Sequence, residues 1–139
     1  MNIRPFHISD ETQVISLWQA CGLVVAWNDP KKDIQRKLTV NPELFLVAEK
    51  DNNIVGSIMG GYEGHRGWIN YLAVLPEYQG SGIGRELISL TEQNLLALGC
   101  PKINLQVRST NTHIIEYYKT LGYTEDHAVG MGKRLIPDC

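Results

Sequence analysis

A glycine-rich turn between a strand and a helix constrains this chain more than any other feature. Glycines alternate in Gly80-Ser81-Gly82-Ile83-Gly84, after an apolar strand expected over Trp68 to Leu75 and at the start of an amphipathic helix expected over Gly82 to Leu98. Glycines let backbone N–H groups approach a ligand, and the first N–H groups of a helix lack internal partners and favour anions. Because Arg85 adds a positive charge, the turn predicts a pyrophosphate site.

The familiar nucleotide-binding motifs do not fit this turn. A dinucleotide fingerprint needs a third glycine where Arg85 stands and an acidic residue about 20 positions further on, whereas the next strand offers Gln106. No Gly-Lys-Ser/Thr follows, as a nucleotide P-loop would require. An ordinary strand-to-helix turn is the alternative interpretation. Three alternating glycines between Gln79 and Arg85 favour a binding site instead.

Hydrophobic periodicity predicts a single domain over residues 1–139, because no repeat, low-complexity segment or linker interrupts the pattern. The class is α+β, with a mixed, mostly antiparallel sheet flanked by helices. One or two further strands are expected in the tail after Leu121. The other expected strands are Ile3–His7, Leu44–Glu49, Ile54–Gly60 and Lys102–Arg108, and the other helices begin near Ser9, near Lys31 and at Thr110.

Composition and charge narrow the function. The chain has 13 basic and 15 acidic residues, a net charge of −2, which argues against a nucleic-acid partner and against a polybasic membrane surface. No apolar run reaches the ~18–20 residues of a membrane helix, and no secretory signal opens the chain. The three cysteines are scattered and the four histidines lack ligand spacing, so no metal site is expected. We expect a cytoplasmic protein.

Two blocks of the sequence resemble the GNAT (Gcn5-related) family of N-acetyltransferases. Gln79 to Gly84 matches its Gln/Arg-x-x-Gly-x-Gly/Ala motif, and Leu72-Ala73-Val74 is similar to its cofactor-facing strand. Asn111 and Tyr118, followed by Gly122-Tyr123, resemble a second family segment at the same spacing. The likeness covers nearly the whole chain and is strongest to the small bacterial YpeA-like group.

The resemblance implies a fold and a cosubstrate. The family's sheet splays between its fourth and fifth strands, and acetyl-CoA occupies the gap. Backbone groups of Leu72 and Val74 would then bind the pantetheine arm, amides of Gln79 to Arg85 would surround the pyrophosphate, and Asn111 would reach the pantetheine from the opposite side. The implied cofactor-binding residues are Leu72, Ala73, Val74, Gln79, Gly80, Ser81, Gly82, Ile83, Gly84, Arg85 and Asn111.

The resemblance also implies a reaction, in which a primary amine attacks the thioester directly in a ternary complex. Tyr118 resembles the family's general acid, which protonates the departing thiolate. The general base stays open, since Gln106 stands where some relatives have glutamate. Glu63 and His65 lie in a loop near the expected acceptor mouth, where a solvated turn is the simpler interpretation. A water chain, or an acceptor that binds already deprotonated, would also serve.

The acceptor is not defined by the sequence. A small metabolite amine and a protein amine both fit, and the segments Trp18–Pro42 and Tyr62–Trp68 are expected to choose between them. A non-catalytic module that binds or senses acyl-CoA is the alternative function, favoured by Gln106 in place of a carboxylate and opposed by Asn111 and Tyr118. A homodimer through Val129 to Ile136 is one assembly that the resemblance allows.

Overall fold

The structure is a computed structural model that describes residues 1–138, and Cys139 lies outside the described residues. The described chain forms two compact units, one of residues 1–104 with Asp138 and one of Leu105–Pro137. The strands are β1 (Asn2–Pro5), β2 (Phe45–Lys50), β3 (Asn53–Tyr62), β4 (Gly67–Val74) and β5 (Ile103–Asn104). The α-helices are α1 (Glu11–Ala20), α2 (Pro30–Lys37), α3 (Ile83–Ala97) and α4 (Thr112–Thr120), and short 3-10 turns cover Ile8–Asp10, Pro42–Leu44 and Pro76–Tyr78.

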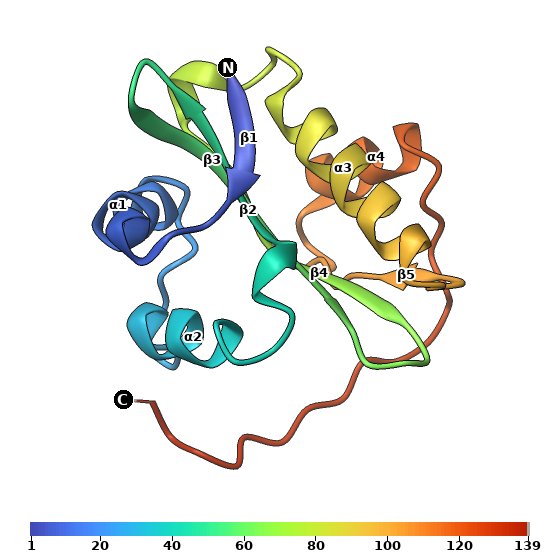
Figure 1. Cartoon of the computed structure of the whole chain (residues 1–139). Helices are drawn as coiled ribbons and strands as arrows, with labels where there is room; N and C mark the ends of the chain where they lie inside the picture. Colours follow the sequence, from blue (N-terminus) through green and yellow to red (C-terminus); the bar gives the residue numbers. More distant parts are fainter. Residues whose placement is uncertain (139) are drawn as a thin grey trace. The chain divides into compact units, whose positions relative to one another are not determined.

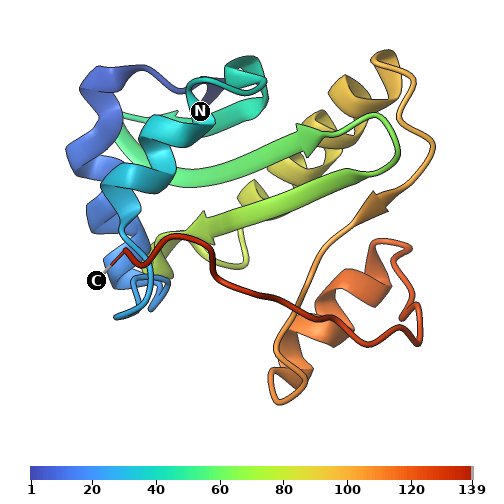
Figure 2. The ribbon, with the colours of Figure 1, turned by 90° about the horizontal axis from the view of Figure 1, so that it is seen from below.

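The five strands form one sheet in the order β1-β2-β3-β4-β5. Neighbours from β1 to β4 are antiparallel, and β3 runs beside β4 along most of its length (Figure 2). The last strand, β5, is parallel to β4 and pairs with it at two positions, Gly67 with Ile103 and Trp68 with Asn104. This confirms the predicted α+β class with a mixed, mostly antiparallel sheet.

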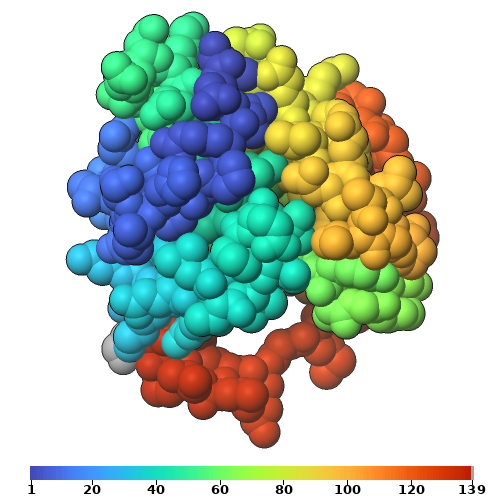
Figure 3. Space-filling model, viewed as in Figure 1, coloured from blue at the N-terminus to red at the C-terminus, as the bar shows by residue number. Residues whose placement is uncertain are grey.

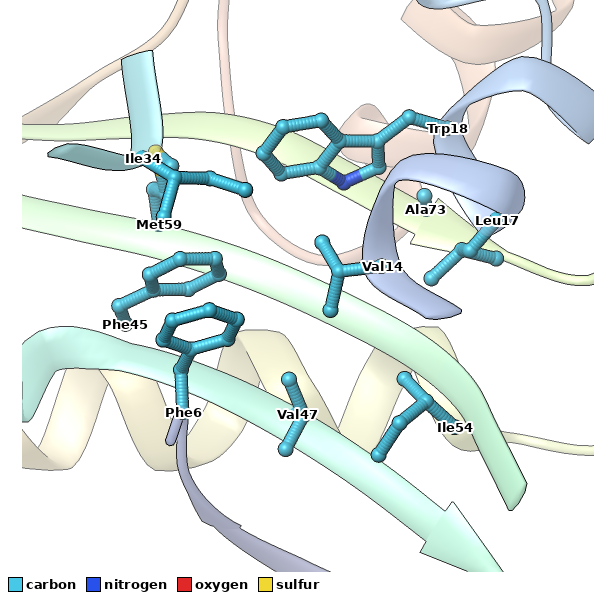
Figure 4. Close-up of a cluster of buried hydrophobic side chains, with 10 residues drawn as sticks. All are labelled: Phe6, Val14, Leu17, Trp18, Ile34, Phe45, Val47, Ile54, Met59 and Ala73. Atoms are coloured by element: carbon cyan, nitrogen blue, oxygen red, sulfur yellow. The ribbon is translucent and has the colours of Figure 1, made fainter. Parts of the chain in front are cut away.

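Helices cover both faces of the first unit. Helices α1 and α2 lie on one face of the sheet and α3 lies on the other (Figure 1), and side chains of α1 and α2, in blue and cyan, cover their side in the space-filling view (Figure 3). The core under α1 and α2 contains the stacked rings of Phe6 and Phe45, whose centroids are 4.4 Å apart, and the fully buried Trp18 (Figure 4). This apolar layer fixes α1 against β4, which carries the site.

Small residues let α3 approach β3 closely. A Cβ on Gly60 would lie 2.9 Å from Thr91 Cγ2, closer than side-chain carbons pack. The hydroxyl of Thr91 donates to the Leu87 carbonyl at 2.9 Å inside the buried helix face. The glycine therefore sets the distance between helix and sheet.

The expected strands after α3 are only partly formed. The strand predicted over Lys102–Arg108 is limited to Ile103–Asn104, and residues 121–138 contain no strand. Apolar alternation predicts a strand from local sequence, but a strand forms only where a neighbouring strand pairs with it, and no strand pairs with these described residues. Exposed side chains of Val129, Met131 and Leu135 show the same absence of a covering sheet.

The second unit is organised around three tyrosines. Tyr118 of α4 makes edge-to-face contacts with Tyr117 and Tyr123, at centroid distances of 5.7 and 5.5 Å. Helix α4 ends with an ion pair from Lys119 to Glu125 at 3.2 Å. Across residues 1–138, no helix is long and apolar enough to cross a membrane, and no three metal-ligating side chains are grouped to hold an ion.

Candidate active site

The edge of β4 that faces β5 has no strand partner after Trp68, the second residue of β4. The Leu75 N–H donates to the Val55 carbonyl of β3, so alternation directs the main-chain groups of Leu72 and Val74 to the opposite edge. There β5 has already ended at Asn104. The Val74 carbonyl accepts from two side chains instead of a strand, Gln79 Nε2 at 3.0 Å and Cys21 Sγ at 3.2 Å. The Leu72 main chain and the Val74 N–H thus face a gap in the sheet.

A buried acceptor without a donor marks the point where β4 and β5 part. Among the described residues, the Oδ1 atom of Asn104 is the only buried side-chain N or O atom that lacks a hydrogen-bond partner. Buried polar groups are normally paired, so such an atom suggests that a donor on a ligand completes it. The sequence analysis did not select Asn104, because its candidate role follows from its place at the end of β5, which the sequence does not show.

The glycine turn leads from this edge into α3. Pro76–Tyr78 forms a 3-10 turn, the Ser81 hydroxyl donates to the Tyr78 carbonyl, and Gly82 is the N-cap residue of α3. Gly80 and Gly82 have φ angles of +81° and +91°, which side chains rarely adopt, and no atom lies within 4 Å of a Cβ placed on either. These glycines are therefore needed for backbone direction, and the space above them is open.

Six consecutive backbone N–H groups at this turn make no hydrogen bond within residues 1–138. They belong to Gly80 through Arg85, and the first N–H bond at the start of α3 runs from Glu86 to the Gly82 carbonyl at 3.1 Å. The side chain of Arg85 is exposed, and no carboxylate of the described residues pairs with it. Unpaired donors at the positive end of a 15-residue helix fit a pyrophosphate.

A β-bulge precedes the open edge. Met59 pairs with Asn70 and Ser57 with Ala73, so Tyr71 and Leu72 together face a single residue of β3. Tyr71 has a φ of +51°, an uncommon value for an aromatic residue. Two hydrogen bonds of 2.9 Å hold the bulge, from Ser57 Oγ to the Tyr71 carbonyl and from Trp18 Nε1 to Ser57 Oγ.

The ring of Tyr71 connects this bulge to α2. It stacks on Trp18 at a centroid distance of 3.8 Å, and its hydroxyl donates to Asp33 Oδ2 at 2.6 Å. Burial and the Asp33 carboxylate raise the pKa of Tyr71 above the usual value of a tyrosine. The sequence analysis selected neither residue, because no local pattern links a helix near residue 33 to a bulge at residue 71.

The predicted residues of the second unit lie on and beside α4. Asn111 precedes the helix and its side chain makes no capping bond, while Tyr118, two turns later, falls on the same face. Tyr118 is buried, and its ring packs edge-to-face against Tyr117 and Tyr123. Burial raises the pKa of Tyr118 to about 12, so the phenol keeps its proton at neutral pH.

The candidate bases of the acceptor loop have structural roles. Glu63 Oε1 accepts from the N–H groups of His65, at 2.8 Å, and Arg66, and these bonds lower the pKa of Glu63. Its side chain therefore closes an exposed turn. His65 is exposed beside Arg66, as the solvated-turn interpretation expects. Gln106, also exposed, lies in the second unit.

A mixed sheet whose open β4 edge leads to a turn of unpaired N–H groups is suited to a long, phosphate-bearing cosubstrate. The model of the acetyltransferase (GNAT) family matches residues 12–123. Acetyltransferase SG1711 of Sodalis glossinidius is 53% identical over 99% of this chain and 98% of its own length, and a Yersinia pestis acetyltransferase is 51% identical over 99% and 98%. This chain belongs to the GNAT acetyltransferase family.

Solved structures agree with this assignment. A crystal structure of Chaetomium thermophilum Naa20 with a bisubstrate analogue has a TM-score of 0.73 and 28% identity, covering 89% of this chain and 71% of that one. An aminoglycoside 6'-N-acetyltransferase of Acinetobacter haemolyticus, at 18% identity and a TM-score of 0.75, covers 98% and 99% and shows the shared fold. The protein is an acyltransferase that uses acetyl-CoA as its acetyl donor.

Proposed function

We propose that this protein transfers the acetyl group of acetyl-CoA to a primary amine, by direct attack within a ternary complex. The observation that carries the proposal is the row of unpaired N–H groups from Gly80 to Arg85, which begins where the open edge of β4 ends. A pyrophosphate at that row lets a pantetheine arm follow the edge, as acetyl-CoA requires. The thioester supplies an activated acetyl group.

Main-chain groups hold most of the cosubstrate in this proposal. The N–H groups of Gly80 to Arg85 bind the pyrophosphate, and Arg85 adds charge. The N–H of Val74 and the main chain of Leu72 bind the pantetheine, and Gln79 supports them by bonding the Val74 carbonyl. The buried methyl of Ala73 anchors the strand in the core, and Asn111 is proposed to contribute a side-chain amide.

Two further groups complete the proposed site. The unpaired Asn104 Oδ1 accepts a hydrogen bond from an N–H group of the bound ligand. Tyr118 donates its proton to the thiolate that leaves, and its pKa of about 12 keeps that proton available at neutral pH. No covalent enzyme intermediate is needed, and residues 1–139 act as one N-acetyltransferase domain, since the family match spans both compact units.

The second candidate is a module that binds acyl-CoA without turnover. The observation in its favour is that Gln106 cannot accept a proton at neutral pH and that Glu63 is engaged in a turn. The acceptor class stays open between a small metabolite amine and a protein amine. We also propose a homodimer that forms through Val129 to Ile136. The apolar side chains of Val129, Met131, Leu135 and Ile136 are exposed, and a dimer would cover them.

Thermal melting tests the cosubstrate and a thiol-release assay tests the reaction. At 100 times the dissociation constant, acetyl-CoA adds about 2.7 kcal/mol to stability, which raises the melting temperature by several degrees. NAD and ATP serve as controls and should not shift it. Free CoA thiol is then followed with lysine, spermidine and a peptide with a free N-terminus. Binding without thiol release from any amine would favour the non-catalytic module.

A further inference from the structure

The bulge at Tyr71 places one aromatic hydroxyl on a particular face of the sheet. Its ring lies against Trp18 of α1 and its hydroxyl meets Asp33 of α2, so it points to the face that those helices cover (Figure 1). The glycine turn enters α3 on the other face. Tyr71 is thus separated by the sheet from the helix that begins at the proposed pyrophosphate site.

The position of Tyr71 along β4 matches the far end of the pantetheine. If the pyrophosphate lies at Gly80 to Arg85 and the arm follows Val74 and Leu72, the thioester comes to the residues just before Leu72. Tyr71 and Val74 are three positions apart along the strand, about 10 Å. Tyr71 therefore lies where an acceptor amine, arriving from the α1 and α2 side, would meet the acetyl group.

The carboxylate behind Tyr71 has one oxygen that the nearby arginine does not contact. Arg36 lies 3.6 Å from Asp33 Oδ1, but its guanidinium is already bound by both carboxylate oxygens of Asp138, each at 2.9 Å. Asp29, at the start of α2, is the other charged neighbour of Arg36. The groups of α1 and β3 that adjoin Tyr71 are Trp18 and Ser57, which do not titrate. Asp33 therefore keeps an oxygen for the Tyr71 proton.

We infer that Tyr71 takes the proton from the acceptor amine and passes its own proton to Asp33, which makes this pair the general base of the reaction. The inference rests on the proposed N-acetyltransferase function. It assigns a catalytic role to Tyr71 and a positioning and proton-accepting role to Asp33. An oriented pair of this kind is the usual arrangement of a proton acceptor and its supporting group.

The proton and electron balance is complete with these groups. The amine nitrogen forms the new N–C bond while the C–S bond breaks, and the electron pair leaves with sulfur. The amine proton moves to Tyr71 Oη as the phenolic proton moves to Asp33 Oδ2, so Tyr71 stays neutral. Sulfur takes a proton from Tyr118, after which Asp33 releases its proton to solvent and Tyr118 regains one from solvent, so both residues return to their starting states.

Asp33→Asn is the decisive variant, because an amide oxygen can still accept the Tyr71 hydrogen bond but cannot take its proton. General-base catalysis contributes 10²- to 10⁴-fold, so we expect kcat at pH 7 to fall about 100-fold. The loss should shrink as the pH approaches the pKa of the amine, where the acceptor arrives deprotonated. Tyr71→Phe keeps the ring on Trp18 and should lose a similar factor. Asp51→Asn, in the β2–β3 turn, is the matched control.

A readout without substrate tests the pair itself. The carboxylate helps to raise the pKa of Tyr71, so Asp33→Asn should lower that pKa, measured from the ring carbon signal by NMR. The acetyl-CoA melting shift should be unchanged in both variants, which shows that the fold and the cosubstrate site persist.

Three outcomes decide the matter. A pH-dependent loss of kcat with a lowered Tyr71 pKa supports the inference. An active wild type whose Asp33→Asn and Tyr71→Phe variants keep kcat within about twofold overturns the inference and leaves the proposed function intact. A wild type that binds acetyl-CoA but releases no thiol with any amine overturns the proposed enzyme reaction, and the base assignment with it.

Discussion

Positive φ angles at Gly80 and Gly82 determine the course of the turn into α3, while the space above both residues stays open. The sequence analysis assigned these glycines to close approach of a ligand, and their backbone angles add a second requirement. A side chain at Gly82 would meet no protein atom, so its effect on a ligand can be measured with little disturbance of packing.

Gly82→Asp should abolish acetyl-CoA binding, because it places a carboxylate among the N–H groups proposed for the pyrophosphate. Gly99→Asp is the control, since Gly99 has a similar φ of +86° and equally open surroundings after α3. Calorimetric titration with acetyl-CoA measures the difference. Equal affinities in the two variants would contradict the assignment of the turn.

The unpaired Asn104 Oδ1 predicts opposite effects on stability and on binding. A buried acceptor without a donor costs about 1–3 kcal/mol, so Asn104→Leu should raise the melting temperature of the free protein. The same change should reduce the additional shift produced by acetyl-CoA. A variant that melts lower than wild type, with an unchanged shift, would remove Asn104 from the site.

Tyr118→Phe should lower turnover by about 100-fold while leaving acetyl-CoA affinity nearly intact. Because the pKa of Tyr118 is about 12, its protonated form persists well above neutral pH, and wild-type turnover should show no loss of this acid below about pH 11. Steady-state rates between pH 7 and 11 check both points. Unchanged turnover in the phenylalanine variant would exclude the acid role.

At the scale of elements, the close approach of α3 to β3 depends on a missing side chain. Gly60→Ala should cost about 1–3 kcal/mol, because its Cβ would lie 2.9 Å from Thr91 Cγ2. Thr91→Ser removes that methyl group and keeps a hydroxyl for the Leu87 carbonyl. In that background the cost of Gly60→Ala should fall, as chemical denaturation of the four proteins would show. Additive costs would mean that another contact limits α3.

Elements defined by local pattern were predicted well from sequence. The glycine turn and the helix after it were predicted within about two residues, since caps, glycines and periodicity are all local. The strand expected up to Arg108 and those of the tail were wrong, because strand pairing depends on a neighbour. The Tyr71–Asp33 contact and the unpaired Asn104 were missed for the same reason, since each depends on residues far apart in sequence.

At the scale of the whole molecule, the chain leaves the first compact unit after Asn104 and joins it again at Asp138. The Asp138 carboxylate binds both guanidinium nitrogens of Arg36 on α2, at 2.9 Å each. Asp138→Asn should weaken this attachment and increase the rate at which a protease cuts residues 122–137, with Asp51→Asn as control. Arg36 is half exposed, so salt screens the ion pair and the difference between wild type and variant should shrink as the salt concentration rises. Equal cleavage rates would show that the ion pair does not hold the segment.

The indole of Trp18 makes the bulge accessible to optical spectroscopy. Trp18 is fully buried against Tyr71, whereas Trp27 is 50% exposed, so a soluble quencher reaches the second far more easily than the first. Emission that survives the quencher then comes mainly from Trp18 and from Trp68, which is partly buried, and Trp68→Phe isolates the signal of the ring beneath the bulge. An amine bound beside Tyr71 would change the surroundings of that ring, and its arrival could be timed by stopped-flow fluorescence without any label.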